Sequence, residues 1–341
     1  AGCKTSTALA LLIAKLESVS LVVWPVVLLV DVLAIILAVL TASVLGILAV
    51  LALTLLVTAV WLLKLPAVVT GLPEQLFVIG GFAVFFFVVG IWATRKILAG
   101  LATEQAGERA GTFLELTPDV RAQIPALSAI LPFLLLIMVT LRLPLADPSP
   151  VFGLAALLVV LLLGVVRYYG VDWLAAVGLG CVLLLEHAWH MNHFMRAPGW
   201  LPLGWYAGFA AVFFLFPFVF QKRLETRVVP WVVAALAGPA HFYLAHRLVK
   251  GLVPDFAYLG LVPVLFAVPA FLALVHLLRS VPAGNPARDT LLALFGGAAL
   301  FFVTLIFPTQ FDRQWITVGW ACEGVALAWL FRRVPHPGLR L

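Results

Sequence analysis

Long apolar stretches, separated by short polar, proline or glycine segments, run along almost the whole chain. An α-helix needs about 20 apolar residues to cross the hydrocarbon core of a bilayer. Residues 1–64 are nearly continuously apolar and predict two or three such spans, for a total of about 11 or 12. From residue 75 onward the pattern predicts spans at 75–94, 123–143, 150–167, 171–189, 201–220, 228–247, 256–278, 290–308 and 314–331.

The composition shows that the bilayer is the solvent for most of this surface. Hydrophobic residues make up 64% of the 341 residues and charged residues only 11%, whereas soluble domains carry about 25% charged residues. In lipid only helices and closed barrels satisfy their backbone hydrogen bonds, and the apolar runs lack the alternation of a barrel strand. We therefore predict an all-α polytopic transmembrane helix bundle that forms a single domain over residues 1–341.

One sizeable polar segment, 95–122, separates two of the predicted spans, and we expect it to be a cytoplasmic loop. Positively charged residues concentrate on the cytoplasmic side of membrane proteins. From Arg95 onward, thirteen basic residues fall on the side of this segment and of the C-terminus. The opposite side holds five: Arg142, Arg196, Arg247, Lys250 and Arg313. The C-terminus is therefore predicted to be cytoplasmic, and we expect an inner (cytoplasmic) membrane protein.

The formal net charge of +6 would suggest a nucleic-acid partner in a soluble protein. In a membrane protein, basic loops that face anionic headgroups explain this charge. We therefore expect the lipid bilayer as the partner and no nucleic acid. Other membrane subunits remain an open alternative as further partners. Cys3, Cys181 and Cys322 are far apart and form no CxxC pair, so neither a disulfide framework nor a zinc site is indicated. No nucleotide-binding or hydrolase motif is present, and the sequence identifies no cofactor.

Most histidines fall at the ends of spans predicted to face the periplasm. The densest group is Glu186, His187, His190 and His193, of which Glu186, His190 and His193 share one helix face. A carboxylate and two imidazoles on one face could relay a proton or bind a metal. The alternative is an ordinary helix end at the membrane interface, so no metal site is assigned.

Three further residues belong to the same predicted outer face. His241 lies in the outer half of its span, where it either makes a buried helix–helix contact or lines a cavity. His241 and His246 are about 140° apart on a helix and cannot form a site by themselves. Arg313 suits an interfacial anchor, with Asp312 as a helix N-cap.

Glu323 lies near the middle of the last predicted span, on a face with Trp320. An ionisable group there costs at least about 2.5 kcal/mol, so it should face protein or water. It is either a cavity carboxylate that contacts substrate or protons, or a structural hydrogen-bonding group. Asp31 raises the same question, unless it lies in a turn between two spans.

The segment from Gln310 to Leu330 carries a pattern of the form Q-x-D-x-x-W-x-x-x-x-W-A-x-E-G-x-A-L-x-W-L. Trp315, Trp320 and Glu323 are among its matching positions. The segment resembles the bacterial membrane-protein family called domain of unknown function 2339, with a looser match over 200–300. Family members usually continue with further spans, so a fragment of a longer chain is one interpretation of the end at Leu341.

The resemblance implies a polytopic bacterial membrane protein and supplies no reaction. Three function classes therefore stay open. The first is a transporter or flippase-like protein for an envelope solute or lipid-linked molecule, with Glu323 in its cavity. The others are a membrane-embedded transferase or hydrolase with a periplasm-facing histidine site, and a structural subunit of a membrane complex.

Overall fold

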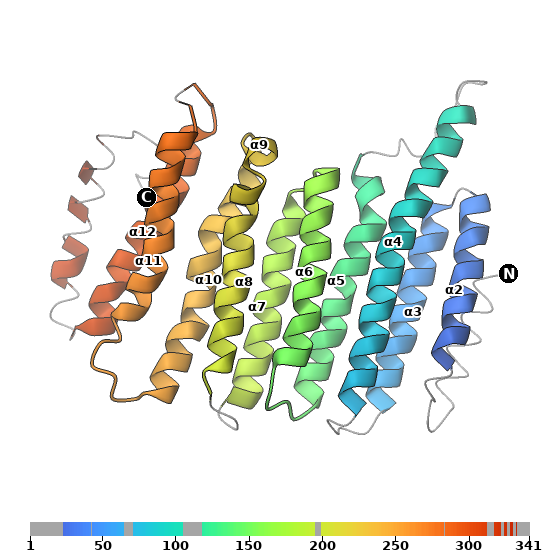
Figure 1. Cartoon of the computed structure of the whole chain (residues 1–341), viewed down its shortest axis with the longest axis horizontal. Helices are drawn as coiled ribbons and strands as arrows, with labels where there is room; N and C mark the ends of the chain where they lie inside the picture. Colours follow the sequence, from blue (N-terminus) through green and yellow to red (C-terminus); the bar gives the residue numbers. More distant parts are fainter. Residues whose placement is uncertain are drawn as a thin grey trace. The chain divides into compact units, whose positions relative to one another are not determined.

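The structure, a computed structural model, describes residues 23–41, 43–64, 71–104, 118–194, 199–282 and 284–311, with short helical pieces between 317 and 332. Every regular element within these residues is a helix, which confirms the predicted all-α fold (Figure 1). Ten of the helices are long and apolar enough to span a bilayer. The other predicted spans involve residues 1–22 and 314–331, which lie wholly or largely outside the described residues.

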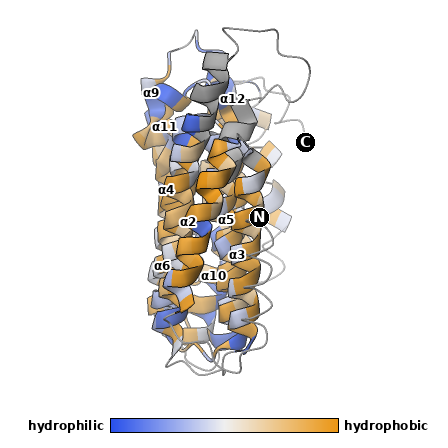
Figure 2. Ribbon diagram, turned by 90° about the vertical axis from the view of Figure 1, so that its right-hand side faces the viewer, coloured by the Kyte–Doolittle hydropathy of each residue, from blue (hydrophilic) through white to orange (hydrophobic). Residues whose placement is uncertain are grey.

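Contacts between helices divide the chain into two compact units, Ala1–His193 and Phe194–Leu341. Polar residues gather mainly near the helix ends, while the middle of the helices is mostly apolar (Figure 2). This distribution is what a bilayer requires, because its centre offers no water to polar groups. The elements of unit 1 are α2 (Val23–Leu40), α3 (Val44–Lys64), α4 (Leu72–Glu104), α5 (Pro118–Arg142), α6 (Ser149–Tyr169), α7 (Trp173–Trp189) and the π-helical turn η2 (His190–Phe194).

Helix α5 is the central helix of unit 1 and packs against α3, α4, α6 and α7. Near its end, Arg142 donates a hydrogen bond to the main-chain carbonyl of Leu62 in the last turn of α3. A cation at this position satisfies a carbonyl that has no partner within its own helix and complements the helix dipole.

Helices α2 and α3 form an antiparallel hairpin whose register is fixed by two facing pairs. The rings of Trp24 and Trp61 meet edge to face at 4.9 Å. Seven residues further along α2, Asp31 faces Thr54, which lies seven residues before Trp61. Asp31 is thus in the middle of a span, so the alternative of a turn position is wrong.

The connection between α6 and α7 is short because Gly170 ends α6 in the left-handed conformation, at φ 80°. Its amide donates to the carbonyl of Val166, which closes the last turn of the helix. A side chain at this φ would be strained, so glycine allows α7 to begin at Trp173.

Unit 2 is organised around α10, which packs against α8, α11 and α12. One cluster of buried side chains, centred on Trp231, Leu277 and Phe295, lies at the α9 end of these helices. A second cluster, with Phe242 and Phe302, lies toward the other end. The elements are α8 (Leu201–Val219), α9 (Gln221–Leu224), α10 (Val228–Leu252), α11 (Leu261–Ser280) and α12 (Arg288–Gln310).

The predicted polar loop 95–122 differs from the observed backbone at both ends. Helix α4 continues to Glu104 and α5 begins at Pro118, and residues 105–117 lie outside the described residues. The sequence after Arg95 is rich in Lys, Ile, Leu, Ala and Glu, and most of these are good helix formers. Helix propensity therefore extends α4 beyond its apolar stretch.

Candidate functional site

Glu186, His190 and His193 lie on one buried face of α7 and of the turn η2 that continues it. Their side chains are 0%, 5% and 4% exposed. Spacings of four and three residues place them on the same side of the helix, and α7 packs with α5 and α6. His187 is only half-buried, and its Nδ1 donates to the carbonyl of Leu183 at 2.7 Å.

A hydrogen bond to α5 fixes the position of His193. Its Nε2 lies 2.6 Å from the carbonyl oxygen of Thr140. In a continuous helix this carbonyl would accept from residue 144, but Pro144 has no N–H. The imidazole therefore satisfies a carbonyl that its own helix cannot, and Nε2 must carry the proton because a carbonyl only accepts.

Trp189 makes a similar contact one turn earlier. Its indole Nε1 donates to the carbonyl of Leu145 at 3.0 Å, and its ring packs edge to face on Phe152. The amide of Ser149, four residues after Leu145, donates instead to the carboxylate of Asp147. Side chains of the α7–η2 segment thus bond to two carbonyls near the α5–α6 connection, and these contacts hold the polar face in place.

This face groups a carboxyl with two imidazoles. Within the part of the chain that the structure describes, no three His, Cys, Asp or Glu side chains are placed to hold a metal ion. Glu186 and His190 lie one helical turn apart, and a carboxyl group and an imidazole can both take up and release protons. The continuation of α7 as a π-helical turn is notable because such turns occur frequently at functional sites.

Asp31 forms a second buried polar site in unit 1. It is 2% exposed, and the hydroxyl of Thr54 lies 2.9 Å from each of its carboxyl oxygens. The hydroxyl of Thr58 bonds to the main-chain carbonyl of Thr54, one turn away. Asp31 and Thr54 thus join α2 to α3 where the surroundings are otherwise apolar.

The two histidines of α10 in unit 2 have different surroundings. His241 is fully buried, and its Nδ1 donates to the carbonyl of Ala237 at 2.7 Å. His246 is half-buried and stacks on Phe242, with ring centroids 5.6 Å apart. Helix α10 therefore places one imidazole inside the helix packing of unit 2 and one at its edge.

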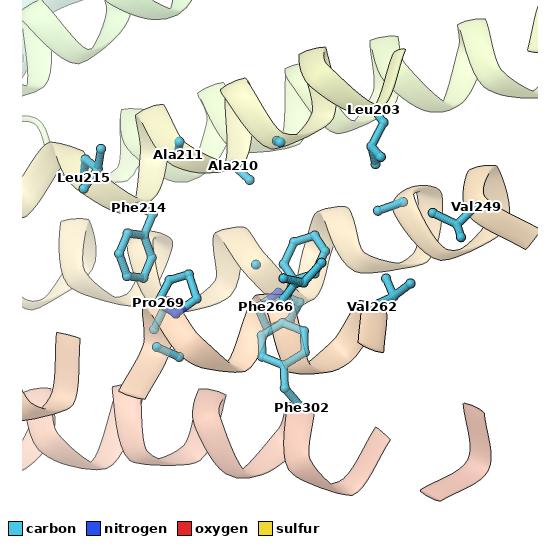
Figure 3. Close-up of a pocket in the computed structure, with 17 residues that line it drawn as sticks. Leu203, Ala210, Ala211, Phe214, Leu215, Val249, Val262, Phe266, Pro269 and Phe302 are labelled. Carbon is cyan, nitrogen blue, oxygen red and sulfur yellow. The ribbon is translucent and has the colours of Figure 1, made fainter. Parts of the chain in front are cut away.

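Unit 2 also contains a cavity of about 460 Å³ between α8, α10, α11 and α12 (Figure 3). All seventeen lining residues are Ala, Gly, Val, Leu, Phe or Pro. Figure 3 shows Leu203, Val249 and Val262 at one end and Leu215 and Pro269 at the other. The cavity therefore offers a long apolar surface and no polar side chain to an occupant.

Several residues singled out by the sequence lie outside the described residues: Glu323, Trp315, Asp312 and Arg313. Trp320 is described, and its side chain is 62% exposed. Glu323 stays a prediction from the sequence, as does the face that it shares with Trp320.

Sequence reasoning missed the partners of the polar groups and the cavity. Pro144, four residues after Thr140, was the available sign that a carbonyl at the end of α5 needs a partner from elsewhere. The small residues Ala207, Ala210 and Ala211 were the sign of space beside α8. Neither sign identifies the helix that lies opposite, because the sequence does not show which helices are neighbours.

Ten candidate spans and an apolar surface along them define a polytopic helical membrane protein in contact with the lipid bilayer. No family model, curated protein or solved structure matches the chain.

Proposed function

We propose that this protein is a proton-coupled, flippase-like transporter of a lipid-linked molecule in the bacterial inner membrane, with a cytoplasmic C-terminus. The orientation rests on the distribution of basic residues along the sequence. The resemblance of Gln310–Leu330 to the domain of unknown function 2339 family is part of the proposal and supports the bacterial membrane setting.

The buried polar face of α7 and η2 carries this proposal. An ionisable side chain at the centre of a membrane span costs about 2.5–3.5 kcal/mol on insertion scales, and ionisable residues within spans commonly mark proton or substrate pathways. Glu186, His190 and His193 concentrate three ionisable groups on one face of a span. Helix packing alone would be served at least as well by apolar side chains.

The hydrogen bond from His193 to Thr140 determines which ring nitrogen of His193 can accept a proton. Because Nε2–H is committed to the carbonyl, Nδ1 is the nitrogen that accepts a proton in the neutral ring. Uptake of a proton at Nδ1 or at the Glu186 carboxyl changes the charge buried between α5, α6 and α7. Such a change favours one arrangement of the helices over another and thereby couples protons to movement of a cargo.

A membrane-embedded transferase or hydrolase is the second candidate, because the same face groups a carboxyl with two imidazoles. We rank it below transport because Nε2 of His193, one of these two imidazoles, already donates to a main-chain carbonyl and is not available to a substrate. Transport uses only Nδ1 of the same ring and the Glu186 carboxyl. A purely structural subunit would explain the apolar surface and the contact of His193 with Thr140, but it gives no reason for a carboxyl group, Glu186, on the same buried face.

Reconstituted vesicles test the transport function. The protein is inserted into vesicles of phosphatidylethanolamine and phosphatidylglycerol that carry fluorescent headgroup-labelled phosphatidylglycerol, and dithionite quenching measures the lipid that crosses. We expect transfer at least about tenfold above protein-free vesicles and accelerated by a pH gradient. Glu186→Gln should abolish the pH dependence, whereas Glu74→Gln, at an exposed site in the first turn of α4, should preserve it.

Transfer no faster than in protein-free vesicles would contradict the proposal for a lipid-linked cargo. Transfer that is unaffected by Glu186→Gln would exclude the polar face from the mechanism. Thermal unfolding of both variants controls for loss of the fold. Cleavage of the labelled lipid, seen by chromatography of the extracted lipids, would favour the enzyme instead.

A further inference from the structure

We infer that the cavity of unit 2 binds one acyl chain of an anionic phospholipid, with the phosphate beside Lys250. The role of this lipid as a cargo rests on the proposed transport function, but its binding can be measured independently. The inference is carried by the chemistry, length and position of the cavity, and by the charges at one end.

The walls select an apolar occupant. None of the seventeen lining side chains can donate or accept a hydrogen bond. A sugar, ion or amino acid would lose its bonds to water there without replacement, at a cost of several kcal/mol for each strong polar group. An acyl chain loses nothing polar and gains contact with Phe266 and Phe302 in the middle of the cavity (Figure 3).

The cavity is somewhat longer than one leaflet. From Leu203 to Leu215 it follows α8 over twelve residues, or about 18 Å at 1.5 Å per residue. Half of the hydrocarbon core of a bilayer is about 15 Å thick. On α11 the lining residues run from Val262 to Ala270, which is the first half of that helix. On α8 and α10 the lining residues run from Leu203 to Leu215 and from Ala235 to Val249, past the middle of each helix. The cavity thus begins at a membrane interface and reaches the bilayer centre.

Small side chains make this space accessible from the membrane. Ala207 and Ala211 lie one turn apart on α8, and both are exposed as well as lining the cavity. Leu265 and Pro269 on α11 are likewise exposed and lining. A lipid chain can therefore enter sideways from the bilayer without crossing a polar layer.

The cationic residues lie at the end where a headgroup would be. Val249 lines the cavity, and the next residue, Lys250, is exposed in the last turn of α10. Arg247 is also exposed there but donates to the hydroxyl of Tyr243 at 2.9 Å. Asp255, in the following turn, is the opposing charge. Lys250, directly after the last lining residue of α10, is thus the best placed cation for a phosphate.

Photo-crosslinking tests this site in the full chain. The probe is phosphatidylglycerol with a diazirine in the middle of one acyl chain, added to vesicles of phosphatidylcholine, and the modified peptides are mapped by mass spectrometry. We expect labels on the lining residues of α8 and α11, and competition by unlabelled phosphatidylglycerol. Ala211→Phe should lower this labelling at least about fivefold, because its ring fills the cavity, and Ala207→Phe provides a second filling variant.

Val212→Phe is the matched control, since Val212 is the exposed neighbour of Ala211 on α8 and does not line the cavity. It should leave the labelling within about twofold of the wild type. Labels spread evenly over all lipid-facing helices, or equal labelling in the wild type and both filling variants, would overturn the assignment. Cavity labelling without lipid transfer in the vesicle assay would overturn the transport function alone.

The headgroup is tested by charge removal. Lys250→Gln should reduce the preference for phosphatidylglycerol over the phosphatidylcholine probe by about threefold or more. Lys222→Gln, in α9 at the opposite end of the helices, should keep the wild-type preference. An unchanged preference in Lys250→Gln would overturn the role given to Lys250 and leave only a neutral acyl-chain site.

Discussion

The two units bury different kinds of side chain. Among the described residues, unit 1 contains every buried Asp, Glu, Gln, Ser, Thr or His side chain except His241, including Asp31, Glu186, His190 and His193. Unit 2 contains an apolar cavity, and its cores are built from aromatic and aliphatic side chains. Both units face the same lipid, so the bilayer did not impose this difference. Unit 1 thus buries polar and ionisable side chains, whereas unit 2 encloses an apolar cavity.

This comparison predicts that packing variants have their largest effect in unit 2. Trp231 is fully buried, contacts Phe218 edge to face at 5.0 Å and donates to the carbonyl of Leu224 at 2.8 Å. Trp231→Ala should destabilise the protein by about 3–5 kcal/mol, since it leaves a cavity and a carbonyl without its partner. Unfolding in detergent micelles measures this. Trp231→Phe should cost much less, and an equal loss would show that packing is not the cause.

Unit 1 should respond most strongly to loss of a polar partner. Thr54→Val removes the hydroxyl that contacts Asp31 and should cost about 2–3 kcal/mol, because a buried carboxyl group loses its hydrogen bond. Replacing both residues, as Asp31→Leu with Thr54→Val, should recover most of that loss. A double-mutant cycle of unfolding free energies measures the coupling. Additive losses would mean that the pair does not organise the hairpin.

A smaller effect is expected where His193 reaches α5. His193→Phe keeps an aromatic ring but leaves the carbonyl of Thr140 without its donor, at about 1–2 kcal/mol. His193→Gln retains an N–H group and should restore part of the stability. Hydrogen exchange at the end of α5 and thermal unfolding provide the measurement. If the His193→Phe variant were as stable as the wild type, the contact between His193 and Thr140 would contribute nothing to the stability of the fold.

The smallest effect concerns the close approach of α10 and α12. A Cβ atom on Gly238 would lie 3.2 Å from the ring of Phe302, which is almost fully buried and lines the cavity. Gly238→Ala should therefore cost about 1 kcal/mol, as the ring must move. Gly297→Ala, at an exposed position with open space, should be neutral or stabilising because alanine favours the helix. Equal thermal stabilities of the two variants would show that Phe302 adapts freely.

The sequence by itself determined the class of protein and the position of most spans. Runs of about 20 apolar residues can satisfy their backbone in lipid only as helices, so composition and spacing suffice for this conclusion. It also selected Glu186, His190 and His193 as one face, since helical periodicity is a local property. The sequence could not decide whether Asp31 is in a span or a turn, because residues 1–64 contain few polar, proline or glycine residues that would mark the ends of spans.

Only the tertiary structure decided which groups meet. The contacts of Asp31 with Thr54 and of His193 with Thr140 join residues 23 and 53 positions apart. The cavity of unit 2 arises where α8, α10, α11 and α12 leave space between them. Such features depend on which helices become neighbours, and in a membrane nearly every helix is apolar on all sides. Hydrophobicity then no longer distinguishes residues buried between helices from residues that face lipid, and the packing of the helices decides which residues are buried.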